Sequence, residues 1–112
     1  SSVAGDRGRQ SNYVYGSAKG MVTRYVQGLQ HRLTLSGSAL KVILVKPGPT
    51  ATPMTAHLTV QGQVMARVED VAQAIVNGAA KAKPVIYAPG QWGLIMMVVR
   101  HLPRFILHRL RL

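Results

Sequence analysis

The stretch LKVILVKPGPTATPMT, residues 40–55, joins an apolar run to a proline-rich segment and predicts how the chain folds. Residues 40–45 are mostly aliphatic and do not alternate strictly with polar residues, which is typical of a strand buried on both faces of a parallel sheet. In residues 47–53, three prolines and a glycine allow neither a helix nor a central strand. The stretch therefore predicts a buried strand whose carboxyl end opens into a loop.

Helical periodicity precedes this strand. Residues 13–35 carry apolar side chains at helical spacing, Ser11 or Asn12 can cap the start, and the sequence SGS at 36–38 ends the segment. Residues 1–4 suit the tail of a preceding strand. The expected apolar stripe consists of Ala18, Val22, Tyr25, Val26, Leu29 and Leu33.

A second helix and strand follow the loop, after an ambiguous segment at residues 55–66. Glu69 and Asp70 suit the first turn of a helix, where the N-terminal partial charge favours acids. PVIYAP, residues 84–89, indicates another short strand, and residues 91–112 a last helix interrupted by Pro103. This order predicts the second half of an α/β sheet with crossover helices. The inner stripe of the second helix is Val68, Val71, Ala72, Ile75, Val76 and Ala79.

The composition restricts the function. The 112 residues suit one domain, and fourteen Lys and Arg against three acids give a net charge of +11, which favours anionic partners. The absence of cysteine excludes disulfides and thiolate metal sites, and the four histidines lack ligand spacing, so we expect no metal. The basic residues form no stripe with interleaved aromatics, so we expect no nucleic-acid partner. A basic nucleic-acid- or membrane-binding module without catalysis stays open as the alternative function.

Three groups of reactive residues are expected to meet at one edge of the sheet, because ligands of open parallel sheets bind outside the carboxyl ends of the strands. Ser1 and Ser2 end the first segment, and NYVYGSAKG, residues 12–20, sets Tyr15 one helical turn before Lys19. PGPTAT leaves the end of the next strand. A cation stabilises a neighbouring phenolate, and a serine hydroxyl can donate to a carbonyl oxygen that gains charge during reduction. The alternative is an ordinary surface pair, because residues four apart share a helix face.

The motifs SSVAG at 1–5, YGSAK at 15–19 and KPGPTATPM at 46–54 resemble the short-chain dehydrogenase/reductase family. The resemblance implies a Rossmann-like, doubly wound parallel sheet and an enzyme that uses NAD or NADP to interconvert a carbonyl and an alcohol. It further implies that Tyr15 is the acid–base, that Ser2, thirteen residues earlier, steadies the carbonyl, and that Lys19 binds the nicotinamide ribose. Ser2 as a simple cap and Thr52 bound within its own loop are the alternatives. The implied cofactor-binding residues are Tyr15, Lys19, Pro47, Gly48, Thr50 and Thr52.

The family's glycine-rich phosphate loop, its cofactor-selecting residue and its catalytic Asn belong before residue 1, and the chain opens without Met or a secretory signal. We therefore expect a catalytic half, residues 1–90, of a longer protein, followed by a C-terminal amphipathic basic helix, residues 91–112. On its own, the piece is expected to be inactive.

Residues 91–112 also suggest partners. Residues 92–99 form an uncharged stretch of eight, far short of the ~20 that span a bilayer. Arg100, Arg104, His108 and Arg111 share one helical face, and Leu102, Phe105, Ile106 and Leu110 lie mostly opposite, as in an interfacial anchor. A substrate lid or a dimer contact is the alternative. We expect a cytoplasmic protein, peripheral at an anionic membrane, that acts on a small apolar or lipid-linked carbonyl substrate.

The helix at residues 13–35 is expected to mediate a homodimer or homotetramer, as it commonly does in the family that the motifs resemble. The expected contact side contains small and polar residues. These are Gly20, Thr23, Gln27 and Gln30.

Overall fold

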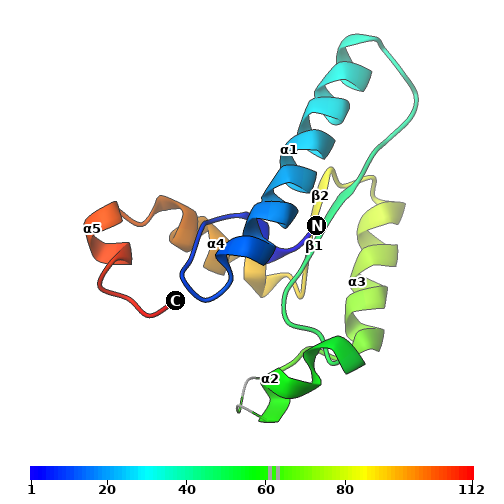
Figure 1. Cartoon of the computed structure of the whole chain (residues 1–112). Helices are drawn as coiled ribbons and strands as arrows, with labels where there is room; N and C mark the ends of the chain where they lie inside the picture. The colour runs from blue at the N-terminus through cyan, green and yellow to red at the C-terminus, as the bar shows by residue number, and fades with distance from the viewer. Residues whose placement is uncertain (61, 63) are drawn as a thin grey trace.

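The computed structural model of the chain describes residues 1–60, 62 and 64–112, and shows an α/β arrangement (Figure 1). Short 3-10 helices, labelled η, lie among the α-helices and strands. In chain order the elements are η1 (Val3–Gly5), α1 (Tyr13–Leu35), β1 (Leu44–Pro47), η2 (Pro53–Thr55), α2 (Ala56–Val60), α3 (Val68–Ala80), β2 (Val85–Ala88), α4 (Gln91–His101) and α5 (Arg104–Leu107).

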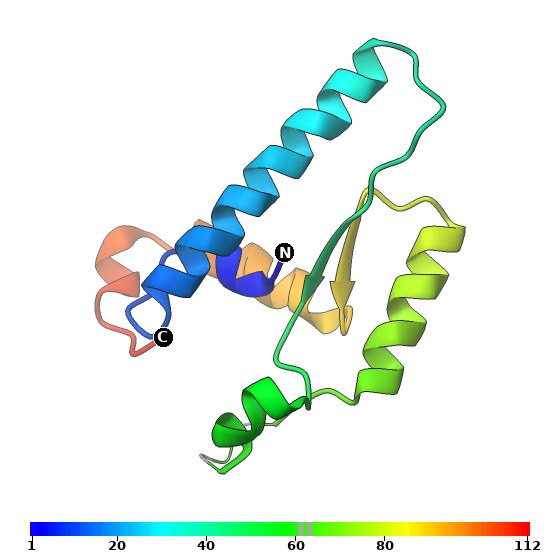
Figure 2. The same cartoon turned by 45° about the vertical axis from the view of Figure 1, so that its right-hand side comes forward.

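The two strands pair in parallel, with Leu44 opposite Val85 and Pro47 opposite Ala88. Parallel neighbours need a long crossover connection, and here the connection contains α3. Helices α1 and α3 flank the sheet on opposite sides in both views (Figures 1 and 2). This confirms the α/β class with parallel strands, and it is compatible with part of a Rossmann-like sheet. The wider doubly wound sheet stays a prediction.

The elements follow the expected order, with two shifts around the proline-rich segment. Strand β1 begins at Leu44 rather than residue 40, and Leu40 is 70% exposed, because its partner β2 begins only at Val85. The expectation that residues 47–53 hold neither a helix nor a central strand was wrong only at Pro53, because β1 is not a central strand of this two-stranded sheet. Pro47 closes β1, and Pro53 opens η2, where proline is tolerated because N–H groups in the first turn need no helical partner.

The start of the chain differs from expectation, whereas the predicted interruption of the last helix at Pro103 is confirmed. Residues 1–4 do not end a strand, because Ser2 caps the short helix η1, although the backbone nitrogen of Ser1 still donates to Val45 O at 3.0 Å. The last helix divides at Leu102, which precedes Pro103 and adopts an extended conformation, as residues before proline prefer. Because α5 ends at Leu107, the predicted basic and apolar faces do not continue along one helix axis.

The apolar stripe predicted for α1 is only partly the side that packs inward, because Val26, Leu29 and Leu33 are half-buried whereas Ala18 is exposed. Val22 is 39% exposed and Tyr25 is 73% exposed, whereas Thr23 is 4% exposed. Gln30 Nε2, on the side expected to form a dimer contact, donates to two carbonyl oxygens of the chain itself, those of Val42 and Pro84. The inner side of α1 thus mixes small and polar residues, such as Thr23 and Gln30, with the half-buried Val26.

The core lies between the sheet and its flanking elements. A Cβ added at Gly78 in α3 would lie 2.4 Å from Ile86 Cδ1, so only glycine lets α3 approach β2 this closely. Of the stripe predicted for α3, Val71 is buried, whereas Val68 and Val76 are exposed. The buried hydrophobic residues are Val3, Ala4, Leu44, Val71, Ile86, Ala88 and Met96.

Candidate functional site

The segment that contains Ser2 docks closely against the first turns of α1. A Cβ at Gly5 would lie 2.7 Å from the carbonyl carbon of Lys19, and one at Gly16 would lie 2.7 Å from Ala4 O. The Ser1 hydroxyl also donates to Lys19 O at 2.9 Å. Glycine at these two positions therefore brings η1 against the part of α1 that carries Tyr15 and Lys19.

Ser2 bridges this junction to the end of β1. Its Oγ accepts a hydrogen bond from Ala4 N at 3.2 Å and donates to Pro47 O at 3.5 Å. Ser2 is therefore a helix cap, as the alternative interpretation held, and it also contacts the first residue of the Pro-Gly loop. These two roles are compatible, because a hydroxyl oxygen has lone pairs for an acceptor role besides its one donated proton.

Tyr15 and Lys19 lie together on the surface of α1. The Lys19 ammonium nitrogen is 5.5 Å from the centre of the Tyr15 ring, within the range of a cation–π contact. Tyr15 is 47% exposed and Lys19 is partly buried. Among the described residues Lys19 forms no ion pair, so its charge is available to a ligand.

The threonines of the proline-rich loop are held within that loop. Thr50 Oγ1 donates to Gly48 O at 3.0 Å, and the Thr52 N–H donates to Thr55 Oγ1 at 3.1 Å. The Thr55 hydroxyl in turn bonds to the carbonyl oxygens of Thr50 and Thr52. In the described part of the chain, no hydrogen bond joins Thr50 or Thr52 to Ser2, Tyr15 or Lys19. The geometry is that of the alternative, in which Thr52 is bound within its own loop.

Gly48 is required because of Trp92, a contact that the sequence did not reveal. A Cβ at Gly48 would lie 2.1 Å from Trp92 Nε1, and the Gly48 N–H donates to Ala88 O at 3.0 Å. The loop at the end of β1 is therefore held between β2 and the first turn of α4. Pro47 and Gly48 position the loop through their backbone, because neither has a polar side chain.

A buried polar cluster of Asp6, Lys46 and Tyr87 lies under this junction. Lys46 Nζ is 2.7 Å from Asp6 Oδ1 and 3.3 Å from Tyr87 Oη, and Tyr87 Oη donates to Asp6 Oδ2 at 2.5 Å. The Lys46 and Asp6 side chains are only 4% and 2% exposed. The cluster ties the residue after η1 to adjacent positions of both strands, since Lys46 pairs with Tyr87 in the sheet register.

The tyrosine of this cluster stays neutral over a wide pH range. Burial raises the pKa of Tyr87 to about 12, Asp6 contributes through its hydrogen bond and negative charge, and Arg100 acts in the opposite direction. We did not predict the cluster, although a signal was present. Lys46 is two residues after Leu44 and so shares its buried strand face, where a charge needs a partner. Asp6 is the only acid outside the first turn of α3.

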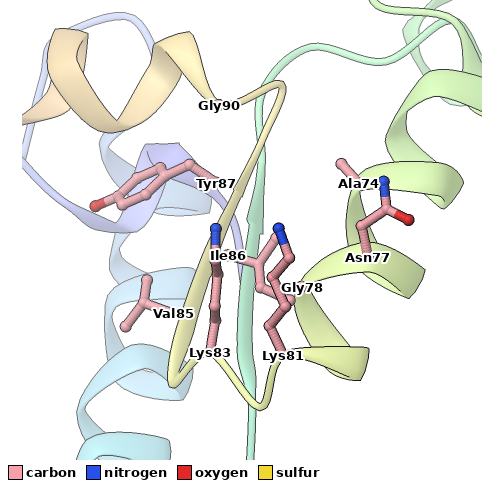
Figure 3. Close-up of a pocket in the computed structure, with 9 residues that line it drawn as sticks. All are labelled: Ala74, Asn77, Gly78, Lys81, Lys83, Val85, Ile86, Tyr87 and Gly90. Atoms are coloured by element: carbon pink, nitrogen blue, oxygen red, sulfur yellow. The ribbon is translucent and has the colours of Figure 1, made fainter.

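A separate pocket of about 420 Å³ lies between α3 and β2 (Figure 3). Its lining includes Asn77, Lys81 and Lys83 but none of the residues predicted for the site. Figure 3 shows Ile86 projecting from β2 toward α3, whereas the Tyr87 ring projects from the other side of the strand. One face of β2 therefore packs against α3, and the other contributes Tyr87 to the polar cluster with Asp6 and Lys46.

Among the described residues, no group of three or more His, Cys, Asp or Glu is arranged to hold a metal ion. No helix in the described part of the chain is both long enough and apolar enough to cross a membrane.

Comparison with known proteins gives the chain a family. A family model described as short chain dehydrogenase matches residues 1–63. The chain is 34% identical to an "uncharacterized oxidoreductase in mprA 5'region" of Streptomyces coelicolor, with 98% of the chain and 42% of that protein aligned. It is also 34% identical to an "uncharacterized oxidoreductase" of Mycobacterium tuberculosis H37Rv, covering 98% of the chain and 43% of the relative. The chain thus spans less than half the length of these relatives. No solved structure gave a significant match.

Proposed function

The chain belongs to the short-chain dehydrogenase family, and from that premise we propose that its protein is an NAD- or NADP-dependent oxidoreductase that interconverts a carbonyl and an alcohol. The observation that carries the proposal is the docking of η1 on α1. It brings the Ser2 segment against the turns that carry Tyr15 and Lys19, while Ser2 itself contacts Pro47 at the end of β1. The names of the two relatives support an oxidoreductase.

In this proposal Tyr15 and Ser2 both act on the carbonyl oxygen of the substrate, and Lys19 acts on Tyr15. As hydride adds to the carbonyl carbon, negative charge develops on the carbonyl oxygen, and the Tyr15 hydroxyl gives that oxygen its proton. The Ser2 hydroxyl donates a hydrogen bond to the same oxygen, for which it must turn away from Pro47 O, a long contact of 3.5 Å. The Lys19 ammonium stabilises the phenolate that Tyr15 becomes. In the reverse direction Tyr15 accepts the proton of the alcohol.

The donor set fits a nicotinamide nucleotide. Lys19 is partly buried and without an ion-pair partner among the described residues, and it can donate to ribose hydroxyls. The bound nucleotide would supply or accept the hydride. Thr52 could contact the carboxamide only after its loop rearranges, because it now shares hydrogen bonds with Thr55. Thr50 and the backbone of Pro47 and Gly48 would support that loop.

The Asp6–Lys46–Tyr87 cluster would position these groups rather than react. Lys46 directly precedes Pro47, whose carbonyl accepts from Ser2, and Asp6 follows directly after η1. Fixing both ends of this junction with one buried ion pair would limit how far Ser2 moves relative to the Pro-Gly loop.

We further propose that the chain is the catalytic part of a longer protein and that residues 1–112 alone are inactive. An oligomer through α1 would use the outer side of that helix, where Met21 is 70% exposed and Tyr25 is 73% exposed, because the inner side is occupied. The test is Met21→Arg, because Met21 lies on the exposed side of α1 whereas Thr23 is buried. An unchanged sedimentation coefficient of the full-length protein would argue against this interface.

The decisive test is Tyr15→Phe in the full-length protein, with ketone reduction followed through nicotinamide absorbance. The variant loses one hydroxyl and little volume, so we expect turnover to fall by at least about 100-fold with an unchanged melting temperature. The matched control is Tyr25→Phe, on the same helix and more exposed than Tyr15, which should retain full activity. Near-normal turnover in a folded Tyr15→Phe variant would refute the acid–base assignment.

A further inference from the structure

A second hollow lies where the end of the chain returns to the loop before α1. Its volume is about 570 Å³, within the range of about 300–1,000 Å³ for small-molecule sites. Both views show the C-terminus beside the segment that leads into α1 (Figures 1 and 2). The side chains that matter for recognition are Arg9, Tyr13, Leu107, His108, Leu110 and Leu112.

Arg9 brings a charge that the chain does not neutralise. Its Nε atom is buried without a hydrogen-bond partner, and no described carboxylate forms an ion pair with it. Asp6, the acid closest to it in sequence, is bound to Lys46 and Tyr87, and the other two acids are in α3. Arginine stays protonated in proteins, so the loop holds a partly buried cation that lacks an anion.

The lining as a whole divides into a cationic part, which is Arg9, and a mostly apolar part. Tyr13 is 66% exposed and Leu110 is 45% exposed, so both present apolar surface that the described chain leaves uncovered. His108 is a second polar group beside Leu107 and can donate a hydrogen bond. A ligand that satisfies both parts needs an anionic group and an aliphatic chain.

We propose that this hollow binds a single amphiphile, one molecule with a phosphate or carboxylate group held by Arg9 and an aliphatic chain held by Tyr13, Leu107 and Leu110. The concave shape favours one bound molecule over a flat bilayer. The binding needs no hydride transfer, so the proposal stands or falls independently of the proposed reaction.

The test is isothermal titration of the full-length protein with monododecyl phosphate below its micelle concentration. The comparison ligands are inorganic phosphate, which lacks the chain, and dodecyl maltoside, which lacks the charge. We expect monododecyl phosphate to bind at least about tenfold more tightly than either, because it alone both hydrogen-bonds to the charged Arg9 and buries an aliphatic chain. Equal binding of dodecyl maltoside, or of inorganic phosphate, would overturn the proposal.

Variants locate the site. Arg9→Gln should weaken monododecyl phosphate binding by about tenfold and leave dodecyl maltoside binding unaffected. Arg9→Lys should keep most of the affinity for monododecyl phosphate. Leu110→Ser should weaken the binding of both amphiphiles. Arg24→Gln, an exposed arginine on α1 that bonds to Gln27, is the matched control. If Arg9→Gln does not fold, the affinities of Leu110→Ser and Arg9→Lys for monododecyl phosphate still test the assignment. Full binding by folded Arg9→Gln, or by folded Leu110→Ser, would refute the assignment.

Discussion

Two regions of this chain use basic residues in opposite ways. In the η1 corner, which we define as residues 1–6, 15–20 and 44–48, Lys46 is buried and paired with Asp6. In the C-terminal segment, residues 91–112, Phe105 is 66% exposed and Leu94 is 66% exposed, and none of the described arginines pairs with an acid. The difference indicates that an internal ion pair stabilises the η1 corner. The exposed apolar side chains and unpaired arginines of the C-terminal segment are instead available for contact with another molecule.

The largest expected effect comes from breaking the buried pair. Asp6→Ala leaves the Lys46 ammonium buried and unpaired, so we expect the free energy of unfolding to fall by about 3–5 kcal/mol. Urea unfolding of the full-length protein measures it. Glu69→Ala removes the partner of Arg67 in an exposed pair and should change stability by less than about 1 kcal/mol. Equal losses in the two variants would mean that the buried Asp6–Lys46 pair contributes no more to stability than an exposed pair.

The next largest effect should come from filling the space at Gly48. In Gly48→Ala the new methyl group collides with the Trp92 indole, and overpacking of this kind costs about 1–3 kcal/mol. Gly28→Ala is the control, because a Cβ there meets nothing within 4 Å and alanine favours a helix by about 1 kcal/mol. Thermal melts of both variants and of Gly48→Ala/Trp92→Leu test the contact. If the Gly48→Ala variant is as stable as the parent, contact with Trp92 does not require glycine at position 48.

A smaller effect concerns pH. The folded-state pKa of Tyr87 is about 12 against about 10 when unfolded, so the folded protein holds an extra proton between these values. Stability from this group is complete below about pH 10 and is lost as the pH rises toward 12. Tyr87→Phe should therefore lose less stability than the parent over this interval in urea titrations. Parallel pH profiles for the two proteins would contradict the cluster geometry.

The smallest effect on folding should come from the C-terminal segment. Phe105→Ser removes an exposed side chain, so stability should change by less than about 0.5 kcal/mol. If this segment rests on an anionic membrane, as the sequence predicts, the same substitution should reduce co-sedimentation with anionic vesicles, and added salt should weaken binding further. Val14→Ser, exposed on α1, is the control. Unchanged vesicle binding by Phe105→Ser would leave the segment as a lid or subunit contact.

The sequence predicted where helices and strands lie better than it predicted which side of a helix packs against the rest of the protein. Periodicity placed α1 at Tyr13–Leu35 because a long helix repeats its signal many times. The same periodicity identified only part of the inner face, because it counts apolar residues and cannot detect that η1 approaches closely enough to need Gly16. Close backbone contact was the stronger constraint.

The candidate site shows the same limit. The order and spacing of Ser2, Tyr15 and Lys19 predicted the family, and the structure joins their segments. The contact between Gly48 and Trp92 and the bond between Asp6 and Tyr87 link residues far apart in the chain, and no local pattern announces them. The catalytic roles themselves stay predictions until the variants are measured.

The hydrogen bonds of Arg7 have a consequence for how this chain is made. Its guanidinium donates to the carbonyl oxygens of Val99, Arg100 and Leu102, and the adjacent Asp6 is joined to Tyr87 across 81 positions. Such distant pairings form late, because the intervening loop must be closed first. On the ribosome, the Arg7 guanidinium must therefore stay in water until residues 99–102 have emerged, whereas Asp6 can already pair with Lys46, 40 positions away.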